Sequence, residues 1–295
     1  MMIYRFSLRY FPSFLLLTLV AINNAWARQT VTYPIYFGDV ERVQMHIDVL
    51  KLALAHSDNE YEVKPHETAD VSPSRAEKMV SRGQLDVMWS ASDSLRESRV
   101  SIVPVPLDYG LLGFRLLMIL EEKQPAFSEV DRLSDLQKFQ ALQVNEWVDT
   151  YILLNAGFDV HLGHYENLPK MLAAKRGDFI PRSIREIRFD MVRWATDGNF
   201  VVDQRSLLIY RQGDFFFVNK QNHKLHQDLK VGLERIYDNG KLKSLLSDFM
   251  EDEGVDIEKE INKRVSFRLN NPYLTDAVKA IDDKYFNVFF AEPTN

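Results

Sequence analysis

The sequence predicts an α/β protein of two lobes, in which each lobe is a mostly parallel sheet flanked by helices. First, short β-rich runs alternate with stretches of helical period between residues 31 and 89, which indicates parallel strands joined by crossover helices. Second, residues 113–120 form a long apolar run, which we interpret as a strand that leads into a second lobe. Third, residues 215–218 form another apolar run, which we interpret as the return to the first lobe.

The first lobe is expected to open with strands and helices in alternation. In chain order we expect a strand at 31–37, a helix at 40–56, a strand at 61–63, a helix at 73–82 and a strand at 85–89. Ser72 and Pro73 mark the start of the second helix, because serine is a favoured cap and proline fits the first helical turn. Gly83 marks its end, since glycine is common just past a helix.

The same argument from hydrophobic periodicity applies to the second lobe and to the C-terminal part of the chain. We expect strands at 140–144, 158–162, 200–202 and 207–210, and helices at 133–139, 150–156, 168–174, 225–237, 241–250 and 275–285. A further helix is expected to run from a cap at Ser183 to Arg193, with Glu186 completing a capping box. We therefore expect lobe 1 to comprise residues 28–118 plus 219–295, and lobe 2 residues 119–218.

The first 27 residues have the features of a secretory signal peptide. Arg5 and Arg9 form a basic region, residues 14–22 form a short apolar core, and residues 25–27 form an A-x-A cleavage site. A bilayer span takes about 20 apolar residues, so cleavage is favoured over an uncleaved anchor. We expect a mature chain that begins at Arg28 and lies in the periplasm.

Composition excludes some classes of function. The chain has a net charge of −6 with charges of both signs, which argues against a nucleic-acid partner. It contains no cysteine, so neither disulfides nor thiol chemistry is available. There is no G-x-S-x-G, H-E-x-x-H or glycine-rich phosphate loop. We expect no enzymatic activity, no cofactor and no metal.

The segment from residue 83 to residue 115 carries the most specific pattern. Gly83, Asp86, Ser90 and Arg96 match the spacing of a segment in the periplasmic solute-binding proteins of family 3, which the chain resembles over most of its mature length. The resemblance implies the type II periplasmic binding protein-like fold of ABC transporter substrate-binding domains. It also implies closure of two lobes on a small polar ligand by hinge bending.

Arg96 is the first candidate ligand-binding residue, because the resemblance places there an arginine that forks onto a ligand carboxylate. Arg99 takes this role if the alignment shifts by three residues, and the alternative for Arg96 is pairing with Asp93 or Glu97. Ser90, Ser92 and Trp89 are further candidates, with loop solvation and core packing as their alternatives.

In lobe 2 the candidates are Trp147, Thr150 and Arg182. Residues 147–150 follow a strand and open a helix, where free N–H groups bind anions, although Asp149 and Thr150 could simply cap that helix. Arg182 is expected at the start of a helix, near the place where the family has an acid that meets the ligand's ammonium group. Because that acid is not evident, we expect an anionic ligand.

The sequence therefore predicts a monomeric periplasmic protein that delivers a small ligand to an ABC permease or a membrane sensor. One alternative is an interaction protein that kept the fold without small-molecule binding, favoured by the missing glycine before residue 150 and the missing acid. An enzyme on the same fold is a third hypothesis, which no catalytic motif supports.

Overall fold

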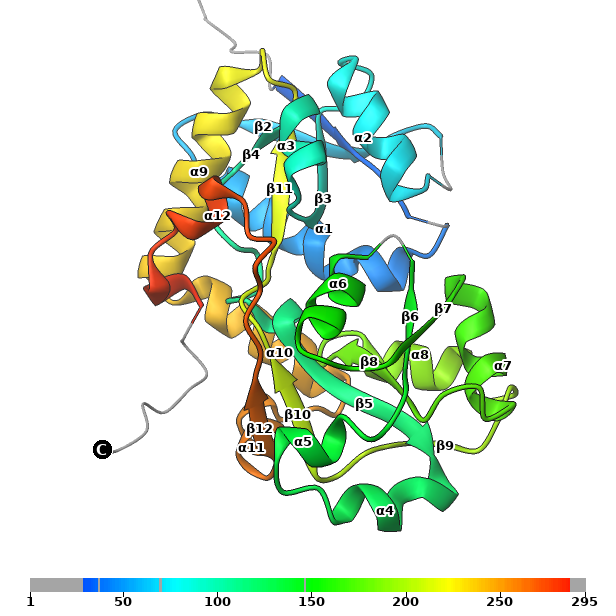
Figure 1. Ribbon diagram of the computed structural model, residues 1–295. Coiled ribbons are helices and arrows are strands. Elements are labelled where there is room, and N and C mark those ends of the chain that lie inside the picture. The colour runs from blue at the N-terminus through cyan, green and yellow to red at the C-terminus, as the bar shows by residue number, and fades with distance from the viewer. Residues whose placement is uncertain (1–28, 37, 69–70, 146, 287–295) are drawn as a thin grey trace, which may run out of the picture.

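The computed structural model describes residues 29–36, 38–68, 71–145 and 147–286 of the 295-residue chain. The expected signal peptide therefore lies outside the described residues. Two lobes stand one above the other in Figure 1, with strands and loops passing between them. None of the described helices has the length and apolar character needed to cross a membrane.

Lobe 1 is the upper body in Figure 1. Its strands are β1 (Gln29–Tyr33), β2 (Tyr61–Pro65), β3 (Val87–Ala91), β4 (Ser101–Ile102) and β11 (Asp214–Val218), and its helices are α1 (Val40–Ala55), α2 (Pro73–Ser81), α3 (Ser94–Arg99), α9 (His223–Asp238) and α12 (Asp276–Lys279). The cap expected at Ser72 is present, because its side chain accepts a hydrogen bond from the Arg75 backbone N–H.

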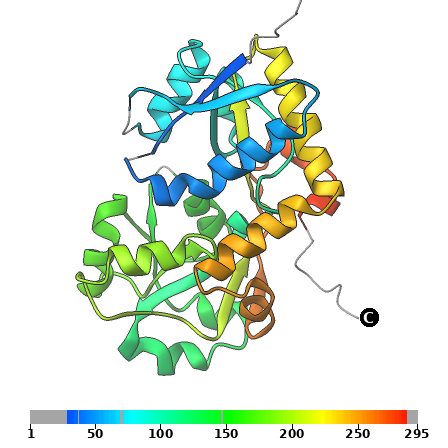
Figure 2. The same cartoon turned by 180° about the vertical axis from the view of Figure 1, so that it is seen from behind.

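Lobe 2 is the lower body, built on one seven-stranded sheet. Its strands are β5 (Phe114–Leu120), β6 (Ala141–Val144), β7 (Val160–Gly163), β8 (Phe179–Ser183), β9 (Phe200–Val202), β10 (Ser206–Ile209) and β12 (Val265–Arg268). Its helices are α4 (Gln124–Ser128), α5 (Leu133–Leu136), α6 (Val148–Asn155), α7 (Leu168–Ala173), α8 (Ile187–Arg193) and α11 (Ile257–Asn262), and α10 (Lys241–Asp252) leads into this lobe from α9 (Figure 2).

The two-lobed α/β architecture is confirmed, but the sheets are mixed rather than mostly parallel. In lobe 2, β6 is parallel to β7 and β8, whereas β5 is antiparallel to β8, β9 and β10. In lobe 1, β1 and β2 are parallel, whereas β11 is antiparallel to β3 and β4. The antiparallel pairings all involve β5 or β11, the strands through which the chain enters lobe 2 and returns to lobe 1.

The C-terminal part departs from the expected assignment of residues 219–295 to lobe 1. Strand β12 is parallel to β10 at the edge of the large sheet, so this part of the chain lies in lobe 2. The chain then passes back to lobe 1, where the Thr275 hydroxyl donates to the Glu97 carboxylate of α3 at 2.6 Å. Strand β12 lies in lobe 2 because it pairs with β10, whose backbone groups would otherwise be unpaired at a sheet edge. The remaining boundaries of the expected lobes stay a proposal.

The core explains why β5 was recognisable as a buried strand. Its side chains alternate, so Leu116 and Met118 join the larger core cluster while Leu117 and Ile119 join a smaller one on the other face of the sheet. The larger cluster extends into lobe 1, where it includes Val31 of β1.

The capping box expected at Ser183 is not formed. Ser183 is the last residue of β8, and its hydroxyl donates to the Leu111 carbonyl at 3.0 Å. Helix α8 begins later, at Ile187, with Glu186 as its N-cap residue. Pairing of β8 with β5 overrides the local helix signal, because Ser183 lies opposite Arg115 in the sheet ladder.

Candidate functional site

A cavity of about 240 Å³ lies between the two lobes. Lobe 1 contributes residues of α1, the end of β3 and α3, and lobe 2 contributes residues of β5, β8, α8 and the start of α6. Ligand pockets of drug-sized molecules usually exceed about 300 Å³, so the cavity suits a small ligand. Its position, between lobes and beyond the carboxyl end of β3, is typical of binding sites in α/β proteins.

Trp89 forms part of the lobe 1 wall and is held from two sides. Its ring stacks on the His46 ring of α1, with centroids 5.0 Å apart and planes 8° apart. The Tyr36 hydroxyl donates to the Trp89 carbonyl at 2.7 Å, which fixes the backbone of β3 beside the cavity. Trp89 is therefore both a core residue, at 3% exposure, and a lining residue.

Arg96 lines the cavity, but much of its guanidinium is already engaged. Its Nη1 group donates to the Ala91 carbonyl and to Asp93 at 2.7 Å, and its Nε lies 3.4 Å from Glu77. The pairing with Asp93 was the alternative expected from the sequence. Arg99 pairs with Glu77 at 2.7 Å and does not line the cavity.

The two candidate serines have different positions. Ser90 lines the cavity. Ser92 does not line it, and its hydroxyl donates to the Glu97 carboxylate. Ser92 therefore helps to hold α3, whose Glu97 also accepts the bond from Thr275.

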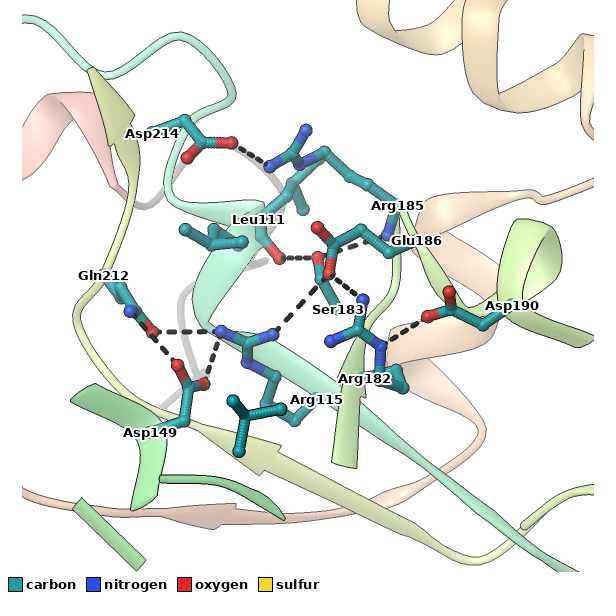
Figure 3. Close-up of polar contacts among 12 residues, drawn as sticks. Leu111, Arg115, Asp149, Arg182, Ser183, Arg185, Glu186, Asp190, Gln212 and Asp214 are labelled. Carbon is teal, nitrogen blue, oxygen red and sulfur yellow. Dashed lines mark hydrogen bonds and ion pairs between the residues drawn. The ribbon is translucent and has the colours of Figure 1, made fainter. Parts of the chain in front are cut away.

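The start of α6 brings Trp147 and Asp149 to the cavity but not Thr150. The Thr150 hydroxyl donates to the Val144 carbonyl at 2.6 Å, so it closes the turn between β6 and α6. Asp149 does not cap the helix through its side chain. It pairs with Arg115 of β5 at 2.5 Å (Figure 3). It also accepts a hydrogen bond from the Tyr210 hydroxyl.

Arg182 lies in strand β8 rather than at the start of a helix, and it is 1% exposed. Its Nε donates to Asp190, and its Nη2 lies 3.0 Å from Glu186 (Figure 3). The guanidinium carbon is 4.9 Å from the centre of the Trp147 ring, a cation–π distance. Its Nη1 group is buried and has no hydrogen-bond partner in the part of the chain described.

Arg185 occupies the floor of the cavity between two acids. It lies 2.9 Å from Asp108 and 2.6 Å from Asp214, and His46 Nε2 lies 3.1 Å from the same Asp214 oxygen. Burial lowers the pKa of His46 below its usual value, so the ring is neutral at neutral pH. Burial opposes ionisation of Asp214 too, but Arg185 and His46 outweigh it and lower its pKa.

Asp108, behind Arg185, is the acid with the opposite shift. Burial raises its pKa to about 6, although Arg185 and the backbone N–H groups of Leu112 and Gly110 oppose the change. These N–H groups donate at 2.8 Å and 3.1 Å, so Asp108 also shapes the turn that leads into β5.

Arg42 reaches into the cavity from the first turn of α1. Its Nη1 group donates to the Tyr165 hydroxyl of lobe 2 at 3.3 Å, so this contact crosses the cleft. The same hydroxyl donates to Asp190. The Glu186 carboxylate is surrounded by arginines, and although burial opposes ionisation, Arg182, Arg42 and Arg115 lower its pKa.

The sequence prediction therefore found part of the lining. Trp89, Ser90, Arg96, Trp147 and Arg182 line the cavity, whereas Ser92 and Thr150 do not. The prediction did not include several lining residues with titratable side chains, namely Arg42, His46, Arg115, Asp149, Arg185, Glu186, Asp190 and Asp214. One signal was available for Arg115, a single charge within the apolar run at 113–120.

His161 and His164, and His223 and His226, are spaced by three residues, and one histidine of each pair has a backbone partner. His161 Nδ1 lies 2.6 Å from the Arg176 carbonyl, and His226 Nε2 lies 2.8 Å from the Ile102 carbonyl. Within the described ranges, no three histidine or acidic side chains are grouped so that they could hold a metal ion.

Comparison with known proteins finds matches among solved structures only. No protein-family model matches the chain, and no curated protein matches it at a significant level. A probable amino-acid ABC transporter extracellular-binding protein, YtmK from Bacillus subtilis, is 16% identical over 77% of this chain and 99% of that chain, with a TM-score of 0.56. An ancestral arginine-binding protein bound to arginine is 13% identical over 75% and 98% of the two chains, with a TM-score of 0.51.

A third match is the substrate-binding protein of an amino acid ABC transporter, 11% identical over 75% of this chain and 99% of that chain, with a TM-score of 0.51. At these identities the similarity establishes the fold, which is the two-lobed fold of solute-binding proteins that the resemblance in sequence implied. All three of these proteins are binding proteins.

Proposed function

We propose that this chain is a solute-binding protein whose two lobes close on a small anionic molecule in the cavity between them. The observation that carries the proposal is the cavity itself, which is lined from both lobes and rich in arginine and aromatic side chains. The fold supports it, because structures of the same fold belong to substrate-binding proteins of amino-acid transporters.

The proposed ligand contacts are the predicted residues that line the cavity. Trp89, Ser90 and Arg96 would contact the ligand from lobe 1, and Trp147 and Arg182 from lobe 2. A guanidinium carries five N–H donors, and the described hydrogen bonds of Arg96 use Nη1, while Nε lies 3.4 Å from Glu77 without a hydrogen bond. The two donors on Nη2 are therefore available for an anion.

The proposed location is the periplasm, after cleavage of the first 27 residues. The basis is the order of basic region, apolar core and A-x-A site in the sequence. From there the protein would deliver its ligand to an ABC permease or a membrane sensor, as a monomer without a nucleic-acid partner. N-terminal sequencing of the protein from a periplasmic fraction should give Arg28 first, and retention of Met1 in membranes would contradict the proposal.

A thermal-shift screen of the mature chain, residues 28–295, against small polar metabolites tests the function. A ligand at 100 times its dissociation constant adds about 2.7 kcal/mol to the stability of the folded state. At least one anionic molecule should therefore raise the melting temperature, whereas neutral analogues of the same size should not. A complete screen without any stabilising molecule would contradict a binding role.

An interaction role without a small ligand is the second candidate. It is favoured by Arg96, which pairs with Asp93 and Glu77, and by Arg42, which reaches across the cleft to Tyr165. Under this alternative the screen would find no ligand, while the purified protein would still bind a membrane sensor in a pull-down.

A further inference from the structure

Arg42 differs from the other arginines that line the cavity. Arg96, Arg115, Arg182 and Arg185 each have a carboxylate within 4 Å. Among the described residues, none places a carboxylate within 4.0 Å of Arg42, although Glu186 and Asp190 raise its pKa from farther away. The described hydrogen-bond partner of its guanidinium is the hydroxyl of Tyr165. Arg42 is therefore a cavity cation without a direct counter-ion.

The position of Arg42 in α1 does not favour its charge. It lies in the first turn, three residues after the N-cap Asp39, where the exposed N–H groups give the helix end a partial positive charge. A cation there is disfavoured by a few tenths of a kcal/mol or more. Helix stability therefore does not account for an arginine at this place, whereas attraction by Glu186 across the cleft and by an anion in the cavity would.

The acids of the cavity have the opposite property, because each already has an arginine close by. Of the described residues that line it, four are acidic. Asp149 pairs with Arg115, Glu186 and Asp190 pair with Arg182, and Asp214 pairs with Arg185. A ligand ammonium next to any of them would also lie next to a guanidinium, whose repulsion offsets the attraction.

Part of the lining is apolar. Val43 and Met45 of α1 face the cavity together with Phe189 of α8 and Phe249 of α10, and the two phenylalanine rings stack with centroids 6.2 Å apart. Such a wall suits a hydrocarbon group of the ligand, because burial of apolar surface is favourable by roughly 25 cal/mol per Å².

We infer that the ligand is an acid with one negative charge, no ammonium group and an apolar body, and that Arg42 binds its anionic group. Tyr165 uses one N–H of the guanidinium, which leaves a pair for a carboxylate. The apolar body then lies against the phenylalanine pair. This inference rests on the proposed function and narrows its ligand class to acids that differ from α-amino acids.

Matched sets of molecules test the ligand class by calorimetry on residues 28–295. Each set holds an amino acid, the same molecule without its ammonium group, and the same molecule without its carboxylate. Phenylalanine, hydrocinnamate and phenethylamine form one set, and leucine, isocaproate and isoamylamine form another. We expect hydrocinnamate or isocaproate to bind with a dissociation constant below about 1 mM and more tightly than the other members of its set.

The role of Arg42 is tested by the ratio of affinities for an acid and its amide, hydrocinnamate against hydrocinnamamide. Arg42→Gln should weaken binding of the acid by about 10- to 150-fold and leave that of the amide nearly unchanged. Arg42→Lys should restore part of the preference, because lysine keeps the charge but not the paired donors. Arg193→Gln is the control, since Arg193 lies beside the same Tyr165 ring but does not line the cavity.

The outcomes separate this inference from the proposed function. Equal or tighter binding of an amino acid or amine would overturn the inference while supporting a solute-binding role. An unchanged acid-to-amide ratio in Arg42→Gln would also overturn it. If neither acid binds below about 1 mM, the inference is wrong. If, in addition, no molecule of the wider metabolite screen binds, the proposed function is wrong as well.

Discussion

Arg185 and Asp214 form an ion pair at 2.6 Å that joins the two lobes beneath the cavity. Arg185 lies two residues after the end of β8 in lobe 2, and Asp214 is the first residue of β11 in lobe 1. Both are buried, and Arg185 also lies 2.9 Å from the fully buried Asp108. One guanidinium therefore pairs with two acids at the point where the chain passes between the lobes.

Removing that guanidinium should destabilise the protein strongly. Arg185→Gln leaves Asp108 and Asp214 buried without their cation, and breaking a buried pair costs about 3–5 kcal/mol. Urea denaturation followed by circular dichroism should show a free energy of unfolding lower by that amount.

Arg193→Gln is the matched control for this measurement. Its partner Asp39 is 3.9 Å away and both side chains are partly exposed, so a change within about 0.5 kcal/mol is expected. If the two variants were equally stable, the buried pair would contribute nothing particular to the fold.

His46 should make the stability depend on pH. Its pKa is lowered in the folded state by burial, while in the unfolded state it has its ordinary value of about 6.5. Below that pH the unfolded chain binds a proton that the folded ring does not, so the free energy of unfolding falls as the pH falls. Asp214, Arg185 and Glu186 face the ring, and the two acids only partly offset the effect of burial.

His46→Gln keeps a donor to Asp214 but cannot titrate, so the variant should lose less stability than the wild type below pH 6.5. Asp108 acts in the opposite direction, because its raised pKa of about 6 makes stability fall as the pH rises towards that value. That contribution is present in both proteins and cancels in their difference. Parallel pH profiles of the melting temperature would show that His46 titrates normally in the folded protein.

Much of the fold was predictable because it is encoded in local patterns. The helix expected at 40–56 is found at Val40–Ala55, and the strand expected at 113–120 at Phe114–Leu120. Ser183 was misread because the S-x-x-E spacing is local, whereas the strand pairing that places Ser183 opposite Arg115 is not. The position of β12 beside β10 likewise depends on pairing between strands that are far apart in the sequence, which short-range periodicity does not reveal.

The site was less predictable for the same reason. The helical period of α1 fixes which residues form its apolar face, but not that Arg42 and His46 would meet residues of lobe 2 and β11. Asp149 had the spacing of a helix cap, and its actual partner Arg115 is 34 residues away in sequence, within another strand. Which charges meet in the cleft depends on how the lobes are placed, and that information is not local.

Gly232 should be indispensable for the packing of lobe 1. It lies in α9, where an added Cβ would come within 2.0 Å of the Ala53 carbonyl oxygen of α1. Alanine favours a helix by about 0.8–1.0 kcal/mol over glycine, but this contact is with backbone and cannot be relieved by a side-chain rotation. Gly232→Ala should therefore destabilise by about 1–3 kcal/mol in thermal or urea unfolding.

Gln227→Ala, an exposed position of the same helix, is the control and should stay within about 0.5 kcal/mol of the wild type. A Gly232→Ala variant that is more stable than the wild type would mean that α1 and α9 separate without penalty.

A comparison of variants at Arg96 and Arg99 distinguishes an arginine that contacts the ligand from one that only forms a structural ion pair. Both lie beside Glu77, but only Arg96 lines the cavity. Arg96→Ala should weaken binding of the ligand found by the screen by about 10- to 150-fold, because a charge-assisted hydrogen bond contributes about 1.5–3 kcal/mol. Arg99→Ala, which removes an ion pair to the same acid, should leave the dissociation constant unchanged. Calorimetry on both variants decides between these roles. An equal loss of ligand affinity in both variants would assign Arg96 a purely structural role. Unchanged affinity in both would place the anion elsewhere in the cleft.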